Sequence, residues 1–256
     1  MTQTFPHYLD RTIVISALPD TVFQFFTDDT RWAAWWGAGS TIDPQPGGRV
    51  FIRYPNGIEV VGEVTGIERP AHLSFTYGFA SGTPVAPGQS RVVIRLEPVS
   101  EGTRLHLRHE FAEPGSVHEH VQGWRYQLSL FGNAVANEVH ADAAAIADRW
   151  FSLWSNPATE ARDAQLQTLA APNVAMRDRF SLIVGIADLR EHLTAVHRFM
   201  PGMALTREGD VRHCQGVVLA DWVARSQDGQ VRGKGTNVFT LSALNQVESV
   251  TGFWHQ

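Results

Sequence analysis

Residues 121–135 read Val-Gln-Gly-Trp-Arg-Tyr-Gln-Leu-Ser-Leu-Phe-Gly-Asn-Ala-Val. Apolar side chains recur there every three or four positions, at Val121, Trp124, Leu128, Phe131 and Val135. This period is that of one face of an α-helix, so the stretch predicts an amphipathic helix of roughly twenty residues. Because the chain before it has a different period, this helix decides how the first half folds.

The segment before this helix is predicted to form short strands joined by turns. The expected strands are 12–17, 50–54, 58–64, 73–79, 92–98 and 103–111. Asn56-Gly57 supplies the positive φ that a tight hairpin requires. In the strand 103–111 Leu105, Leu107, His109 and Phe111 share one face. A sheet with one apolar face, followed by a long amphipathic helix, is expected to curl around that helix.

Several stretches of this half resemble the SRPBCC, or START-like, helix-grip superfamily. They are residues 13–23, Trp35-Trp36, Gly47-Gly48-Arg49-Val50, 63–70 and Gly123-Trp124. The last two are similar to the branch named for the activator of the heat-shock ATPase. The resemblance covers about residues 8–139 and implies a cavity between sheet and helix for lipid-like or polycyclic ligands. The expected lining is Trp35, Trp36, Tyr54, Phe75, Tyr77 and Trp124, with His109 as either a core residue or a ligand contact.

The second half alternates helices and strands in a different order. Asp142 is expected to cap a helix over 143–155, and further helices are expected over 164–170 and 189–200. A strand is predicted over 174–180, and three more over 216–225, 231–241 and 246–254. We therefore predict an α+β protein of two domains, residues 1–140 and 141–256.

The second half resembles the nuclear transport factor two superfamily, which includes the SnoaL-like polyketide cyclases and the ketosteroid isomerases. The matching stretches are residues 149–151, 174–178, 185–190 and 246–250. The resemblance implies a cone-shaped α+β barrel with an apolar cavity. It implies no particular reaction, because one fold carries many functions.

Asp178 is the leading candidate for a catalytic residue. It continues the face of Val174 and Met176, so its carboxylate is expected to point into the cone. At the matching position the isomerases have the general base that moves a proton beside a carbonyl. A carboxylate in an apolar cavity is suited to proton transfer. The alternative is a structural role, either an ion pair with Arg177 or Arg179 or a strand-end cap.

Asn237 is expected to face the same cavity. The isomerases have a hydrogen-bond donor to the enolate at this position, and an amide can donate without a perturbed pKa. The alternative is a buried amide bonded to backbone. Trp150 replaces the isomerases' tyrosine donor, a departure that puts steroid isomerisation in doubt. The remaining expected lining residues are Trp154, Trp222 and Phe239, all of which could equally be core.

Composition narrows the classes of function. The net charge is −5, and no run of Lys or Arg is present, which argues against nucleic acid as a partner. No basic amphipathic helix or long apolar run points to a membrane. One cysteine, Cys214, and no leader-like start are typical of a cytoplasmic protein. No motif calls for a metal or a cofactor. A homodimer through the second sheet is expected from the resemblance alone.

Two functions of different classes remain open. The first is a cofactor-free cyclase or isomerase that transfers a proton next to a carbonyl of a hydrophobic molecule in the second cavity. The second is a protein without chemistry whose two cavities bind or sequester small apolar molecules. A weaker third is regulation of a partner protein, as by the heat-shock ATPase activators.

Overall fold

The computed structural model describes residues 4–255. The chain forms two compact units, Met1–Ala136 and Asn137–Gln256, each with its own sheet. None of the described helices is long and apolar enough to cross a membrane. The α+β class and the two-domain arrangement predicted from the sequence are confirmed.

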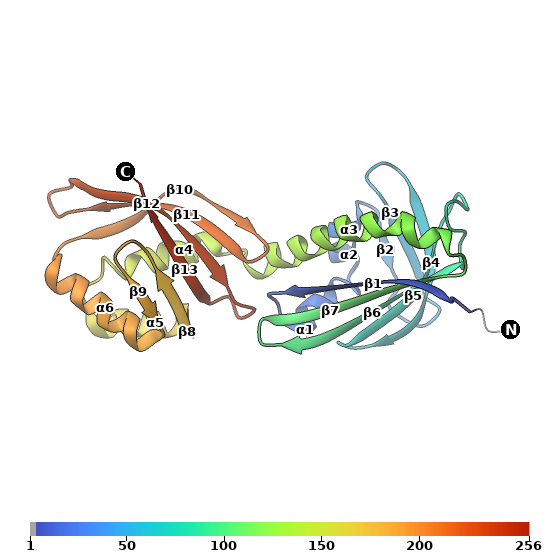
Figure 1. Cartoon of the computed structure of the whole chain (residues 1–256), viewed down its shortest axis with the longest axis horizontal. Coiled ribbons are helices and arrows are strands. Elements are labelled where there is room, and N and C mark those ends of the chain that lie inside the picture. Colours follow the sequence, from blue (N-terminus) through green and yellow to red (C-terminus); the bar gives the residue numbers. More distant parts are fainter. Residues whose placement is uncertain (1–3, 256) are drawn as a thin grey trace. The chain divides into compact units, whose positions relative to one another are not determined.

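The first unit is one antiparallel sheet that curves around a helix (Figure 1). Its strand order is β1-β7-β6-β5-β4-β3-β2. The strands are β1 (His7–Ile15), β2 (Thr41–Ile42), β3 (Arg49–Arg53), β4 (Glu59–Glu68), β5 (His72–Phe79), β6 (Ser90–Val99) and β7 (Gly102–Phe111). Helix α3 (Gly115–Val139) crosses the inner face and buries Trp124, Leu128, Phe131 and Val135 there. The amphipathic stripe therefore predicted both the helix and the face it buries.

Two short helices complete this unit. They are α1 (Pro19–Gln24) and α2 (Asp29–Trp36), and α2 was not predicted. Asp28 caps α2 by accepting a hydrogen bond from the backbone N–H of Arg31 (3.0 Å). All three of its tryptophans are buried, so this eight-residue helix is anchored by packing more than by a helical pattern.

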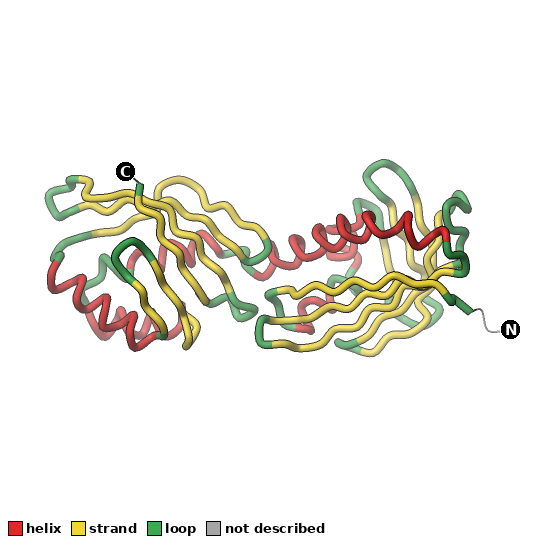
Figure 2. The backbone as a smooth tube through the Cα atoms, in the orientation of Figure 1, coloured by secondary structure: helices red, strands yellow, loops and turns green. Residues whose placement is uncertain are grey.

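The second unit is a six-stranded mixed sheet with three helices against one face (Figure 2). The order is β10-β11-β12-β13-β8-β9, and β8 and β13 run parallel. The helices are α4 (Ala143–Ser152), α5 (Thr159–Leu169) and α6 (Ile186–Phe199). The strands are β8 (Ala170–Arg177), β9 (Leu182–Val184), β10 (Ala204–Cys214), β11 (Val217–Arg225), β12 (Val231–Leu241) and β13 (Val247–Trp254).

Three expectations for this unit were wrong. Asp142 does not cap α4; its carboxylate accepts a hydrogen bond from the side-chain amide of Asn245 (2.5 Å). Strands β9 and β10 were not predicted, because β9 has three residues and β10 is mostly polar and exposed. Strand β8 ends at Arg177, so Asp178 lies just beyond it and not within it.

Candidate functional site

The candidate site is a cavity of about 630 Å³ between the sheet and helices α4 and α6 of the second unit. Most of its lining is aromatic or aliphatic. The polar lining residues are Asp178, Ser181, His192, Arg232 and Asn237. A cavity of this size, apolar with a few polar groups, is typical of small-molecule sites.

An aromatic row forms part of the cavity floor. Trp222 and Trp254 are both paired with Gly235, one on each side of it in the sheet. Their rings meet edge to face with centroids 4.9 Å apart. A Cβ on Gly235 would lie 2.5 Å from the Trp222 ring, and one on Gly233 would lie 2.7 Å from the Trp254 ring. The two glycines therefore provide the space that the two indoles occupy.

A polar row lies beside the aromatic one. On one side Gly252 is paired with Asn237 of β12. On the other side the parallel register of β13 with β8 continues to Asp178, which therefore lies beside Gly252. A Cβ on Gly252 would be 3.1 Å from Asn237 Oδ1 and 3.1 Å from Asp178 Cβ. Glycine at position 252 thus lets the two polar groups approach each other with no side chain between them. Asp178 and Asn237 stand side by side on the sheet.

The two rows are joined by indole N–H groups. Trp222 Nε1 donates to Asn237 Oδ1 (2.9 Å), and Trp254 Nε1 donates to Asp178 Oδ2 (3.4 Å). Since an indole can only donate, Asn237 must turn its oxygen toward Trp222. Its Nδ2 group is then directed away from Trp222 as a hydrogen-bond donor, and no described protein group accepts from it. A donor fixed in this way is suited to a ligand's carbonyl oxygen.

Asp178 is half-buried at the cavity wall, with both oxygens oriented. Its Oδ1 accepts from the backbone N–H of Phe180 (2.7 Å), and Oδ2 accepts from Trp254. Among the described residues it forms no ion pair with Arg177 or Arg179; Arg179 instead lies over the ring of Phe180 (5.5 Å). The alternative of an ion pair does not apply, whereas that of a strand-end cap does: Asp178 follows the last residue of β8, and its Oδ1 closes the turn to Phe180. The same carboxylate lines the cavity.

His192 on α6 also lines the cavity and was not predicted. Burial lowers its pKa below the usual value, while the nearby carboxylates of Asp178 and Asp188 act in the opposite direction. Its ring is therefore neutral near pH 7 and can accept or pass on a proton. The signal was present in the sequence, because His192 lies three positions after Leu189 and four before Val196 on the same helix face.

The other expected lining residues of this unit fall into two groups. Trp150, Trp154 and Trp222 line the cavity. Phe239 does not; it is buried behind the wall, with its ring 6.0 Å from those of Trp150 and Phe151. Trp150 Nε1 is buried and has no hydrogen-bond partner, so this donor faces neither solvent nor a protein acceptor.

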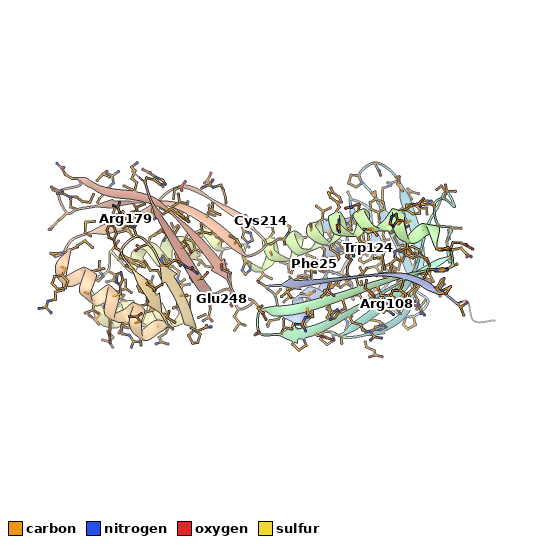
Figure 3. All side chains as sticks on the ribbon, viewed as in Figure 1. Phe25, Arg108, Trp124, Arg179, Cys214 and Glu248 are labelled. Atoms are coloured by element: carbon orange, nitrogen blue, oxygen red, sulfur yellow. The ribbon has the colours of Figure 1, made fainter. Side chains whose placement is uncertain are left out.

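The aromatic residues expected to line a cavity in the first unit contact one another. Trp35 and Trp36 stack with centroids 4.2 Å apart, and Trp36 reaches Trp124 at 5.7 Å. Trp32 lies between Trp35 (5.3 Å) and Phe75 (5.8 Å). Figure 3 labels Trp124 and Phe25 in this layer between α3 and the sheet. These rings pack as a core.

His109 and Tyr77 belong to the same layer and have protein partners. Trp124 Nε1 donates to His109 Nδ1 (3.0 Å), so the proton of the neutral ring is on Nε2, which donates to Ser90 Oγ (2.9 Å). Ser90 in turn donates to the carbonyl of Tyr77 (2.7 Å), whose hydroxyl meets that of Tyr54 (3.0 Å). Burial lowers the pKa of His109 well below its usual value. Both nitrogens of His109 are occupied, as in a satisfied core histidine.

A metal centre is not formed by the part of the chain that is described: no three His, Cys, Asp or Glu side chains are placed to share an ion. Cys214 is an exposed free cysteine.

Residues 16–136 match the family model described as Activator of Hsp90 ATPase homolog 1-like protein. The match lies within the first unit and confirms the resemblance expected from its sequence. No curated protein matches the chain significantly.

Each of the following solved structures is similar to about half of this chain. A protein of the SnoaL-like family from Agrobacterium tumefaciens, whose name suggests an isomerase, is 21% identical with a TM-score of 0.43, over 44% of this chain and 97% of that one. A protein from Mesorhizobium loti is 21% identical (TM-score 0.46) over 50% of this chain and 96% of its own. CalU16 from Micromonospora echinospora is 24% identical (TM-score 0.40), over 52% and 78%.

Proposed function

We propose that the second unit binds a small hydrophobic carbonyl compound and transfers a proton at the carbon next to the carbonyl, without a cofactor. The observation that carries this proposal is that Asp178 and Asn237 both line one apolar cavity and lie on either side of Gly252. The carboxylate and the amide can therefore reach adjacent atoms of one ligand in the cavity.

Each residue has a chemical role in this proposal. The ligand's carbonyl oxygen accepts a hydrogen bond from Asn237 Nδ2, and Asp178 takes the proton from the adjacent carbon. The electron pair of the broken C–H bond moves onto the oxygen, where the amide stabilises the enolate. Return of the proton to a different carbon gives an isomer, and attack of the enolate on a second carbonyl closes a ring. Trp222 and Trp254 act as positioning residues through their N–H groups.

The competing proposal is a binding protein without chemistry. It is favoured by the hydrogen bonds of Asp178, because both of its oxygens already accept from protein donors. We assign ligand binding to the second unit in either case, because the rings of the first unit pack against one another.

Exchange of hydrogen for deuterium separates the two proposals without knowledge of the natural substrate. The bicyclic ketone 1-tetralone, incubated with the protein in D₂O, should exchange its α-protons faster than in buffer, as followed by NMR. Asp178→Asn should reduce this catalysis by about 10²–10⁴-fold while the ketone still quenches tryptophan fluorescence. Asp210→Asn, an exposed carboxylate away from the cavity lining, serves as the matched control. Binding without catalysed exchange in the unmodified protein would favour the binding protein.

A further inference from the structure

The mouth of the cavity carries large apolar side chains that water reaches. Three residues of the lining are well exposed: Phe180 at 70%, Met200 at 48% and Trp254 at 37%. They come from the β8–β9 loop, the end of α6 and the end of β13, and the rings of Phe180 and Trp254 are 5.1 Å apart. Phe199, beside Met200, is 74% exposed. Exposed apolar residues gathered around an opening mark an interaction site.

Arginines accompany these side chains. Arg179 lies over the ring of Phe180, and Arg198 lies over the ring of Phe199, each at 5.5 Å. Arg232 lines the mouth itself and is 3.6 Å from Asp228. No ion pair of Arg179 or Arg198 is found among residues 4–255. Figure 3 labels Arg179 beside the turn between β8 and β9. Arg179 and Arg198 thus carry two positive charges without an ion pair next to these rings, whereas Arg232 is paired with Asp228 and Asp178 lines the cavity.

We propose that this mouth docks on an anionic lipid surface, with Phe180, Phe199 and Met200 in the interface and the three arginines at the headgroup phosphates. Aromatic rings with adjacent cations are the side chains that favour the boundary between headgroups and acyl chains. Docking would place the opening of an apolar cavity against an apolar phase. A hydrophobic ligand could then enter the cavity without crossing water.

A second copy of the chain fits this surface less well. In a two-fold dimer the same patch lies on both subunits, so Arg179 and Arg198, which have no ion pair, would face a surface that carries the same charges. Such a dimer would also close the cavity against its ligand. The earlier expectation of no membrane partner depended on the lack of a basic amphipathic helix, whereas this surface is assembled from separate segments of the fold.

Flotation with lipid vesicles tests the proposal on the full chain. We expect the protein to float with vesicles of 70% phosphatidylcholine and 30% phosphatidylglycerol at low salt, and binding to fall at least five-fold with pure phosphatidylcholine or in 0.5 M NaCl. The double variants Phe180→Ser/Met200→Ser and Arg179→Gln/Arg198→Gln should each lower the bound fraction to a similar extent. Leu182→Ser/Val184→Ser is the matched control, because these side chains are 82% and 68% exposed but lie on β9 outside the cavity lining.

The proposal fails if the unmodified protein does not float with the anionic vesicles, or if the control variant loses as much binding as the mouth variants. It also fails if light scattering shows a dimer that Phe180→Ser/Met200→Ser dissociates, since a second copy then covers the mouth. Near-ultraviolet circular dichroism establishes that each variant is folded. Docking is measured without ketone, and hydrogen exchange is measured without vesicles. Failure of the docking proposal therefore does not affect the proposal of proton transfer, and the reverse also holds.

Discussion

Both units are rich in tryptophan, but in the first unit the rings pack into a core and in the second they line a cavity. In the first unit Trp35, Trp36 and Trp124 contact one another, and the polar atoms of His109 are all bonded within the layer. In the second unit Trp222 and Trp254 lie over glycines at the edge of a cavity, and each holds a polar group that faces open space. Aromatic content alone therefore does not distinguish a core from a binding site; the neighbours across the strands do.

The sharpest test of this difference is the cost of removing one tryptophan from each unit. Trp35→Ala deletes a ring packed on several others and should lower the free energy of unfolding by about 3–5 kcal/mol. Trp154→Ala should cost less than half as much, because this ring already lacks neighbours on the cavity side. Urea unfolding followed by circular dichroism measures both. Equal losses would mean that the two aromatic sets are packed alike.

Acid should act on the first unit through its buried histidine. Because the pKa of His109 lies well below its usual value of 6.5, the unfolded chain takes up a proton near pH 6.5 that the folded chain excludes. The resulting stability is present above pH 6.5 and is lost as the pH falls below it, by up to about 1.4 kcal/mol per pH unit.

The control for this pH dependence is His109→Gln, which cannot titrate. It should be less stable at neutral pH, yet its stability should fall less steeply between pH 6.5 and 5.5. His120, whose pKa burial also lowers, retains a part of the slope in this variant. A slope unchanged by the substitution would show that His109 is not the group that excludes the proton.

The smallest expected effect concerns the indole N–H groups of the second unit. Trp222→Phe keeps a ring over Gly235 but frees the amide of Asn237 to rotate, which should weaken ketone binding by about 0.5–1.5 kcal/mol. Trp254→Phe removes the corresponding bond to Asp178 and should change the exchange rate more than the affinity. Titration of tryptophan fluorescence and the exchange assay measure the two effects. If both variants change the same quantity equally, the two indoles do not hold separate groups.

The sequence predicted the elements whose side chains follow a regular period. The stripe from Val121 to Val135 became α3, and Asn56-Gly57 became a turn in which Gly57 has φ of 83°. Helix α2 and strands β9 and β10 were missed because they are short or lack alternation. The secondary structure of these segments is determined by tertiary packing, so it cannot be predicted from a local sequence pattern.

The site was predictable in part for the same reason. Asn237 was identified from the face of its strand, and Asp178 from the face of a strand that ends one residue before it; both line the cavity. The roles of Gly235 and Gly252 depend on which strands are neighbours, and pairing of β13 with β8 does not follow from either sequence segment alone. Trp254 also reaches the cavity through the long-range pairing of β13. Arg232 reaches it from the start of β12, directly after the β11–β12 hairpin turn.

The parallel contact of β8 with β13 also has a consequence for how the second unit assembles. Asp178 and Trp254 are 76 positions apart, so the bond between them closes a long loop. Pairings of such long sequence separation close late, because the entropy of a large loop is lost before any contact repays it. The cavity floor therefore depends on segments that are far apart in the sequence. The site is complete only when β13 has paired with β8 in the folded unit.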